Sequence, residues 1–310
     1  MHKHDKPAHA HHHGHPRPGD AATVNRAFAL GVALNAAFVV VEAAAGVLAG
    51  SLALLADAGH NLSDVLALVL AWLAHWAGGK PPRRGWTYGF GRASILASVV
   101  NATVLLIAVG AIGLTAVRRL AEPSPIEEGI VIAVAAAGVA INGATAALFL
   151  ADRKADLNVR SAFLHMVADA GLSLAVVVAA ALIAFTGWLW LDPALSLVIA
   201  AAIAVSAWAL MIESWRLALD AVPERVDRDA VEVYLAALPG VTDVHDLHIW
   251  PLSTRQIALT AHLVRPDSAA DDAFLDAVAA ELDHRFGIAH TTLQVEQGHG
   301  PCRLAPSHVV

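Results

Sequence analysis

The chain has 310 residues, of which 57% are hydrophobic and only 15% charged, and its formal net charge at pH 7 is −7. This composition is too apolar for a disordered chain or a nucleic-acid-binding protein. The single cysteine, Cys302, excludes an internal disulfide framework and a four-cysteine zinc site. The first 219 residues carry 13 acidic and 14 basic side chains, whereas the remainder carries 14 acidic and 6 basic ones. A nearly neutral, apolar body followed by an acidic segment predicts a membrane protein with a soluble C-terminal domain.

Residues 1–25 contain seven of the 17 histidines, interleaved with lysine, alanine and proline. Such a segment has no apolar run to pack into a core, and its composition is typical of loose metal binding. We expect a disordered, histidine-rich cytoplasmic tail that captures metal without forming one defined site.

Six apolar stretches then follow, each long enough to cross a bilayer, which requires about 20 residues. They lack the polar face that helices of soluble proteins show. Their residues are Ala27–Gly50, Leu52–Ala77, Ala93–Val117, Gly129–Ala151, Ser161–Phe185 and Trp188–Met211. The sequence therefore predicts an all-α transmembrane bundle of six helices over residues 26–215.

Lysine and arginine in the connecting segments predict the orientation of this bundle. One side, which includes the N-terminus, carries 11 of these residues, whereas the other carries only Arg118 and Arg119. Both termini are therefore expected in the cytoplasm. The alanine-rich spans and the lack of a recognisable targeting signal favour a bacterial inner membrane.

Residues 216–300 have the pattern of a small soluble domain. Helices are predicted over 227–238 and 269–286, and strands over 244–252, 256–264 and 291–296. This α-β-β-α-β order predicts a small α+β sandwich, followed by a tail over residues 301–310. Its helix and strand edges are suited to pairing with a second copy.

Ionisable side chains inside a bilayer are costly and are therefore candidates for a functional site. His60 and Asp64 in the second span, and His165 and Asp169 in the fifth, share the spacing i, i+4, which places each pair on one helix face. Because the two spans are antiparallel, a rise of about 1.5 Å per residue brings the pairs to similar depths. Two imidazoles and two carboxylates suit a tetrahedral divalent ion such as zinc. The alternative is a hydrogen-bonded polar cluster that joins the helices.

The other ionisable residues of the spans have competing structural explanations. Asp57 suits either a vestibule that attracts cations or a helix start, and Glu42 suits the bundle interior. Asp192 precedes a proline and is expected to cap the start of the sixth span. His75 is expected in an interfacial aromatic belt.

Histidines also gather in the C-terminal domain. His245 opens the first predicted strand, His262 lies late in the second and Glu296 ends the third. If the strands are adjacent, these residues share one edge, which makes a second cation site plausible, with ordinary surface histidines as the alternative. The same segment also contains His248, His290, His299 and Cys302.

Several motifs resemble the cation diffusion facilitators, a family of zinc and related divalent-cation/proton antiporters. The first are SLALLADAGHNLSD (Ser51–Asp64) and HMVAD (His165–Asp169), whose paired HxxxD motifs are highly specific, as is HDLHIW (His245–Trp250). The others are YGFGRASILAS (Tyr88–Ser98), VHDLHIWPLS (Val244–Ser253), TAHLV (Thr260–Val264) and HTTLQVE (His290–Glu296). The resemblance thus covers nearly all of the chain after the histidine-rich segment.

The resemblance implies a homodimer of six-span protomers in the lipid bilayer, with metallochaperone-like cytoplasmic domains and no nucleic-acid partner. It implies that His60, Asp64, His165 and Asp169 form the transport site, and histidine at position 60 matches the zinc-preferring members. Carried over in the same way, the ligands of a cytoplasmic-domain site are His245, His262 and Glu296. The chain departs from many relatives at Ser94, where they carry an acidic residue, and the segment 152–158 lacks a histidine run.

The function expected from these features is export of a divalent cation, Zn²⁺ above all, in exchange for protons as counter-ion. Cobalt, cadmium and nickel remain alternatives, because His/Asp sites bind all of them. An intramembrane metalloenzyme requires an open coordination position and a general base, commonly HExxH, which the chain lacks. We therefore expect no enzymatic activity, and a metal sensor without transport is the remaining rival.

Overall fold

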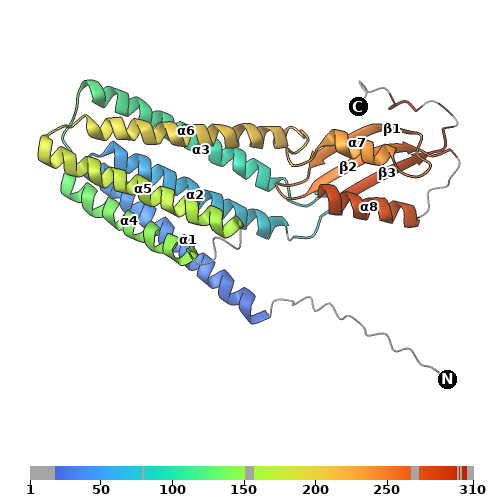
Figure 1. Cartoon of the computed structure of the whole chain (residues 1–310), viewed down its shortest axis with the longest axis horizontal. Coiled ribbons are helices and arrows are strands. Elements are labelled where there is room, and N and C mark those ends of the chain that lie inside the picture. The colour runs from blue at the N-terminus through green and yellow to red at the C-terminus, as the bar shows by residue number, and fades with distance from the viewer. Residues whose placement is uncertain are drawn as a thin grey trace.

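The computed structural model describes residues 18–78, 80–150, 157–266, 272–298, 300 and 302–305. Within these residues, six long helices precede a small domain of helices and strands (Figure 1). The long helices are α1 (Pro18–Ala49), α2 (Leu52–Gly78), α3 (Ala93–Ala121), α4 (Glu128–Phe149), α5 (Leu157–Thr186) and α6 (Leu191–Ala218). The histidine-rich residues 1–17 and the tail residues 306–310 lie outside the described part, as does His299.

Five of these helices are long and apolar enough to cross a membrane, namely α2 to α6. Helix α1 adds a shorter apolar segment, Asn35–Ala49, among the residues whose side chains are described. The predicted helical transmembrane domain is thus confirmed. Apolar side chains such as Ile107, Val198 and Val205 are exposed on its outer surface, where a bilayer would cover them.

Two helix boundaries differ from those expected. Helix α1 begins at Pro18, so residues 18–25, which we assigned to the tail, are helical; proline is favoured in a first helical turn because its missing N–H has no partner there. Helix α6 continues to Ala218, past residue 215, and ends just before Asp220, whose φ of 61° lies outside the helical region.

The bundle is built from neighbouring pairs, α1 with α2, α3 with α6 and α4 with α5. Helix α2 also contacts α3, α5 and α6, which gives it a central place. Many of the buried side chains are alanines, whose small size lets the helices approach one another closely. The start of α1 and the small domain lie at the same end of the bundle (Figure 1).

Asp192 has a different role from the one expected. It lies in the first turn of α6 but makes no cap there. Instead it caps α2 from a distance, because its carboxylate accepts hydrogen bonds from Leu52 N at 2.8 Å, Ala53 N at 3.3 Å and the Ser51 hydroxyl at 2.5 Å. Only 3% of Asp192 is exposed. This buried contact fixes the start of α2 against α6.

Asp192→Ala is expected to lower the free energy of unfolding by about 2 kcal/mol or more, since it removes a cap and leaves buried donors unpaired. The measurement is thermal unfolding of the detergent-purified protein. Asp276→Ala, at an exposed position of the small domain, is the matched control and should change stability by less than about 0.5 kcal/mol. Equal stability of the two variants would contradict the role of Asp192 as the cap of α2.

The small domain has the predicted α-β-β-α-β order, in α7 (Arg228–Ala236), β1 (Asp243–Pro251), β2 (Ile257–Val264), α8 (Asp272–Phe286) and β3 (His290–Glu296). Strand β2 is central, antiparallel to β1 and parallel to β3. Asp227 caps α7 by accepting from Asp229 N at 3.0 Å. Both helices pack on the sheet through one apolar core, which includes Leu235 and Leu282.

The small domain is joined to the bundle by the turn between β1 and β2. The Ser94 hydroxyl at the start of α3 accepts a hydrogen bond from Thr254 N at 3.1 Å, so Ser94 connects α3 to the small domain. Gly91 leaves room for the turn, because a Cβ there would lie 2.7 Å from the Leu252 carbonyl oxygen.

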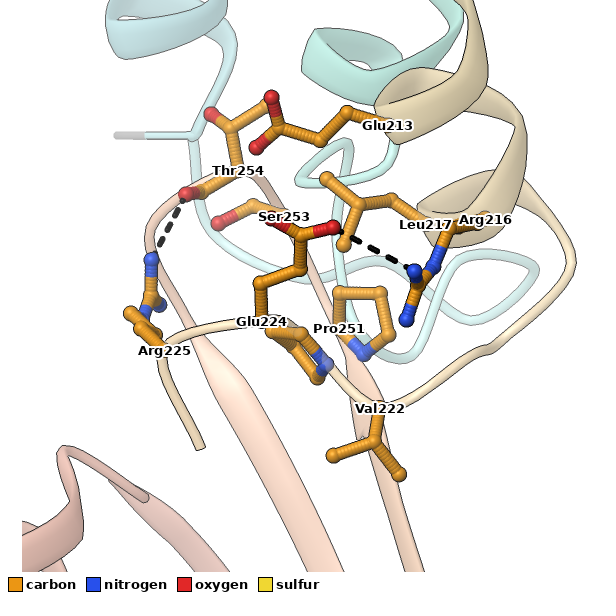
Figure 2. Close-up of a pocket in the computed structure, with 10 residues that line it drawn as sticks. Glu213, Arg216, Leu217, Val222, Glu224, Arg225, Pro251, Ser253 and Thr254 are labelled. Atoms are coloured by element: carbon orange, nitrogen blue, oxygen red, sulfur yellow. Dashed lines mark hydrogen bonds and ion pairs between the residues drawn. The ribbon is translucent and has the colours of Figure 1, made fainter. Parts of the chain in front are cut away.

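On the side of α6, the turn borders a cavity of about 220 Å³ (Figure 2). An ion pair between Arg216 and Glu224, at 3.3 Å, joins the end of α6 to the segment that follows it. Arg225 donates to the Thr254 carbonyl oxygen at 3.3 Å. Contacts from α3 and from the segment that follows α6 therefore hold the turn in place.

Candidate metal sites

The four intramembrane residues singled out in the sequence lie together between α2 and α5. His60 Nε2 is 3.3 Å from Asp169 Oδ1 and 3.9 Å from Asp64 Oδ2. His165 Nε2 is 3.2 Å from the same Asp64 oxygen and 3.6 Å from Asp169 Oδ2. Each imidazole thus faces both carboxylates, one on its own helix and one on the other. We call these four residues the membrane quartet.

The spacing of the quartet suits a small tetrahedral ion. Ligand atoms about 2.0–2.1 Å from a tetrahedral zinc ion lie about 3.3–3.4 Å from one another. Separations of 3.2 to 3.9 Å between imidazole nitrogens and carboxylate oxygens are close to this value. Ligand atoms of His60, Asp64 and Asp169 all lie within 4.8 Å of each other. His165 lies outside this group, so a shift of its side chain would be needed to complete the four-ligand site.

A cavity of about 330 Å³ opens beside the quartet. Asp64, His165 and Asp169 line it, together with the amide side chains of Asn35 and Asn142. Asn61 and the residues just after Asp64 supply the rest of the lining from α2, and those after Asp64 lead toward the end of the helix nearer the small domain. The quartet is thus reached from that end of the bundle.

On the opposite side of the quartet the bundle is closed around two carboxyl groups. Glu42 is fully buried and Asp57 is 1% exposed. Glu42 Oε2 accepts from the Asn61 amide at 2.8 Å, and Asp57 Oδ2 accepts from the Ser173 hydroxyl at 2.9 Å. Asp57 is therefore buried in the bundle interior instead of lining an open vestibule, and Glu42 lies in the interior as its pattern predicted.

In the small domain, the strand register brings the predicted cytoplasmic residues to one place. His245 of β1 lies opposite His262 of β2, and Val264, two residues farther along β2, pairs with Glu296 of β3. Residues two apart on a strand share a face. The three side chains therefore gather at one end of the sheet.

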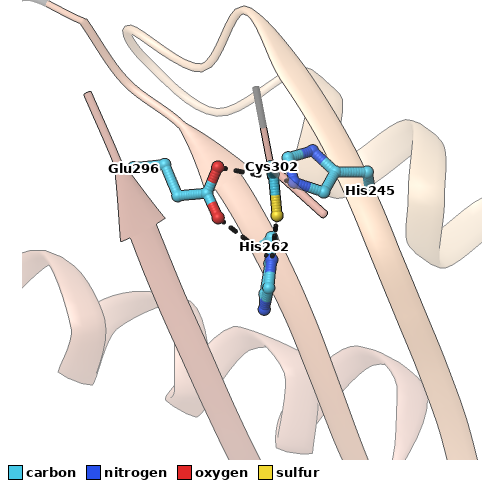
Figure 3. Close-up of side chains that lie close together, drawn as sticks. All are labelled: His245, His262, Glu296 and Cys302. Atoms are coloured by element: carbon cyan, nitrogen blue, oxygen red, sulfur yellow. Dashed lines mark hydrogen bonds and ion pairs between the residues drawn. The ribbon is translucent and has the colours of Figure 1, made fainter. Parts of the chain in front are cut away.

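These side chains form a compact cluster with Cys302 (Figure 3). Glu296 contacts both histidines, His262 Nδ1 at 3.1 Å and His245 Nε2 at 3.5 Å. Cys302 Sγ lies 3.6 Å from His262 Nδ1. The ligand atoms of all four residues lie within 4.8 Å of each other. We call this group the cytoplasmic cluster.

The cytoplasmic cluster has the chemistry of a metal site. His245 Nε2 is buried and makes no hydrogen bond to the described residues, although Glu296 lies 3.5 Å away, and an ion between the two would satisfy it. Burial raises the pKa of Glu296. Hydrogen bonds from Gln294 and Cys302 and the two neighbouring imidazoles together lower it by more, so the net pKa lies below its ordinary value. An ionised carboxylate, two imidazoles and a thiol fit a tetrahedral zinc ion.

The other histidines noted in the sequence are placed elsewhere. His248 Nε2 contacts Asp246 at 2.9 Å, and His290 stacks edge-on against Tyr88 at 5.6 Å between ring centres. The side chain of His75 lies outside the described part. Sequence reasoning placed Cys302 in the same segment but did not assign it as a ligand, because no pattern shows that the chain after β3 turns back to the sheet.

Comparison with known proteins agrees with this architecture. Residues 28–217 match the family model of the cation efflux transmembrane domain, and residues 223–298 match that of the cation efflux protein cytoplasmic domain. The chain is 35% identical over 295 residues to the metal cation efflux system protein CzcD of Cupriavidus metallidurans, covering 94% of this chain and 92% of that protein.

Two further relatives have similar coverage. The zinc transporter ZitB of Escherichia coli is 35% identical over 303 residues, with 95% and 96% of the two chains covered. A cadmium, cobalt and zinc/H(+)-K(+) antiporter of Bacillus subtilis is 32% identical over 264 residues, with 84% and 85% covered. The chain is a multi-pass membrane protein and a transporter, not an enzyme, and it belongs to the cation efflux family, the cation diffusion facilitators.

Proposed function

We propose that this chain exports Zn²⁺ from the cytoplasm in exchange for protons, with the membrane quartet as its transport site. The observation that carries the proposal is the arrangement of two imidazoles and two carboxylates at 3.2 to 3.9 Å within the bundle. The names of the relatives, a zinc transporter and a cadmium, cobalt and zinc antiporter, support divalent metal as cargo.

Zinc is the preferred cargo in this proposal because two of the four ligands are nitrogen atoms. Imidazole suits zinc, whereas sites built from carboxylates alone suit magnesium, calcium and manganese. Cobalt, cadmium and nickel also bind mixed His/Asp sites, so they are the alternative substrates of the same mechanism.

Proton exchange follows from the chemistry of the ligands. A metal binds only deprotonated imidazoles and carboxylates, so metal and protons compete for the same electron pairs. The cavity beside Asp64 and the closed region around Glu42 and Asp57 support an arrangement open toward the small domain. Rocking of the bundle would then expose the quartet to the other side, where protons replace the metal.

The proposed setting is a bacterial inner membrane with both termini in the cytoplasm. The predominance of lysine and arginine on one side of the bundle supports this orientation. The cytoplasmic-domain family match supports pairing through that domain, which we assign to a homodimer.

The decisive experiment measures zinc flux into proteoliposomes under an imposed proton gradient. We expect zinc to accumulate on the more acidic side, and a protonophore to abolish the accumulation. Zinc binding without flux would instead identify a metal sensor, and flux that is indifferent to the gradient would overturn proton exchange. Repeating the assay with cobalt, cadmium and nickel ranks the substrates.

We further propose that the cytoplasmic cluster binds a second zinc ion through His245, His262, Glu296 and Cys302. When bound, the ion would link all three strands of the sheet with the segment that follows β3. The buried His245 Nε2, which faces Glu296 at 3.5 Å without a hydrogen bond, is the observation that supports this site.

Cys302→Ser is expected to weaken zinc binding at the cytoplasmic cluster by about 10-fold or more, because a hydroxyl is a poorer zinc ligand than a thiolate. The measurement is zinc competition with a chromogenic chelator, using the full chain with Asp64→Ala and Asp169→Ala to disable the membrane quartet. Ser253→Ala, at a turn distant from the cluster, is the control. Equal affinity of the Cys302 variant and its parent would remove the thiol from the ligand set.

A further inference from the structure

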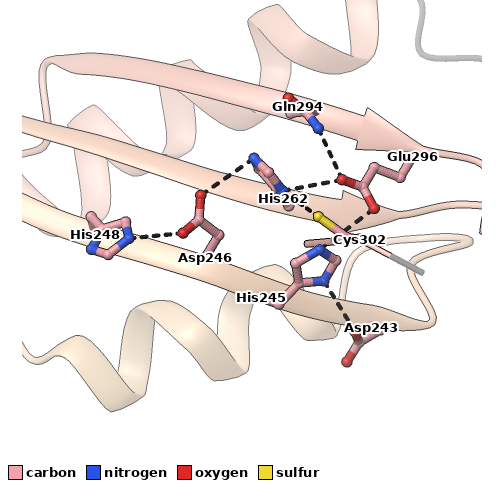
Figure 4. Close-up of polar contacts among 8 residues, drawn as sticks. All are labelled: Asp243, His245, Asp246, His248, His262, Gln294, Glu296 and Cys302. Carbon is pink, nitrogen blue, oxygen red and sulfur yellow. Dashed lines mark hydrogen bonds and ion pairs between the residues drawn. The ribbon is translucent and has the colours of Figure 1, made fainter. Parts of the chain in front are cut away.

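Each histidine of the cytoplasmic cluster has a second carboxylate on its outer ring nitrogen (Figure 4). His245 Nδ1 lies 3.2 Å from Asp243 Oδ2, and His262 Nε2 lies 3.4 Å from Asp246 Oδ2. Neither aspartate belongs to the cluster itself. Both come from the start of β1, whereas His262 belongs to β2.

The two histidines turn opposite nitrogens toward the cluster. His245 presents Nε2 to Glu296, whereas His262 presents Nδ1 to Glu296 and Cys302. A neutral imidazole binds metal only through the nitrogen that carries no proton, and the hydrogen bond at the other nitrogen selects this tautomer. The outer carboxylate of each histidine therefore favours the tautomer that this arrangement requires, with the proton on Nδ1 of His245 and on Nε2 of His262.

Asp246 reaches His262 because of an irregularity in β1. The β1–β2 register shifts between His245 and His248, and Asp246 has a left-handed φ of 52°. Such a backbone is unfavourable for most side chains, although aspartate and asparagine tolerate it better than others. The bulge re-aims the side chain. The Asp246 carboxylate then lies between His248, at 2.9 Å, and His262.

The two outer aspartates differ in how far they are buried. The Asp246 side chain is 12% exposed, whereas that of Asp243 is 65% exposed. A carboxylate that competes little with water makes the stronger hydrogen bond. Asp243 lies closer to its histidine, at 3.2 Å against 3.4 Å, but water competes more strongly for this exposed carboxylate than for Asp246.

We infer that Asp246 is a positioning residue of the cytoplasmic metal site: its carboxylate accepts the Nε2 proton of His262 and so presents Nδ1 to the ion. This inference rests on the proposed second zinc site. The His248 contact holds the carboxylate from its other oxygen. The β1 bulge thus serves metal binding by bringing a carboxylate of one strand behind a ligand of the next.

The test uses three replacements at Asp246 in the full-length, detergent-purified protein. Asp246→Gly keeps the left-handed backbone and removes the carboxylate. Asp246→Asn keeps both the backbone preference and an oxygen acceptor. Asp246→Ala removes the carboxylate and disfavours the backbone. Asp243→Asn is the control at the exposed outer carboxylate.

Titration with Co²⁺ reports this site selectively. The chain has one cysteine, so a thiolate-to-cobalt charge-transfer band arises only where Cys302 binds the ion. Cobalt at the membrane quartet does not contribute, because those four residues contain no sulfur. Competition with zinc then yields the zinc affinity of the same site, and a Cys302→Ser sample is the spectroscopic blank.

We expect the glycine and alanine variants to bind zinc about 10–100-fold more weakly, as is usual when an outer-shell partner is lost. The asparagine variant should recover most of this loss, and Asp243→Asn should change affinity by less than about 3-fold. Wild-type affinity in the glycine variant would overturn the inference, and so would equal losses in the glycine and asparagine variants. Absence of the band would exclude Cys302 as a ligand, and absence of zinc binding by the parent chain with Asp64→Ala and Asp169→Ala would overturn the second zinc site itself, while zinc flux through the membrane quartet is measured independently.

Discussion

His60→Ala is expected to lower the rate of zinc transport into proteoliposomes by at least about 100-fold, since the loss of even an outer-shell partner of a bound metal commonly costs about 10–100-fold. The His60 imidazole contacts both carboxylates of the quartet, Asp64 and Asp169. Its removal leaves three ligands and places two carboxylates in apolar surroundings without one of their two partners. We therefore expect weaker metal binding and slower transport together.

The control for this variant is His284→Ala, an exposed histidine near the end of α8. It should transport zinc at the rate of the parent protein. Because the quartet acts as a unit, the double variant with Asp169→Ala should be little slower than His60→Ala alone. Parent-like exchange of zinc for protons by His60→Ala would refute the assignment of the quartet as transport site.

The architecture of the membrane domain was predictable because its signals are local. Apolar runs of about 20 residues mark the spans, and the i, i+4 spacing marks one helix face. The matching depth of the two His/Asp pairs then predicted that they meet, as His165 and Asp64 do at 3.2 Å.

Contacts between distant segments were not predictable in this way. Asp192 has the local pattern of a cap for its own helix, but its partners are Ser51, Leu52 and Ala53, about 140 residues away in the chain. Nothing in the order of residues states which helix start lies beside it. The sequence thus indicated the capping chemistry and not the helix that receives it.

In the cytoplasmic cluster, too, the local pattern was predictable and the contacts between distant segments were not. The strand pattern placed His245 and His262 at one edge, and the register pairs them directly. The bulge at Asp246 and the return of Cys302 depend on backbone geometry that alternation of polar and apolar residues does not encode. The pairing of the two histidines was therefore foreseeable, whereas the positions of Cys302 and of the outer carboxylates were not.

His60→Asp is expected to keep four ligands in the quartet but to change the metal that it prefers. The variant replaces an imidazole nitrogen with a third carboxylate, and oxygen ligands favour manganese over zinc relative to nitrogen ligands. We expect the ratio of zinc to manganese transport to fall by about 10-fold or more, which corresponds to about 1.4 kcal/mol. Competition between the two metals in the proteoliposome assay measures this ratio.

His165→Asp provides the matched comparison, because His165 also faces Asp64 and Asp169 but is more exposed than His60, with 45% against 25% of the side chain accessible. A ligand beside the open cavity is better hydrated, so its replacement should change the preference in the same direction and by less. An unchanged zinc preference in both variants would show that selectivity arises outside the quartet. A change in His60→Asp alone would instead place the discriminating ligand on α2, at the closed side of the site.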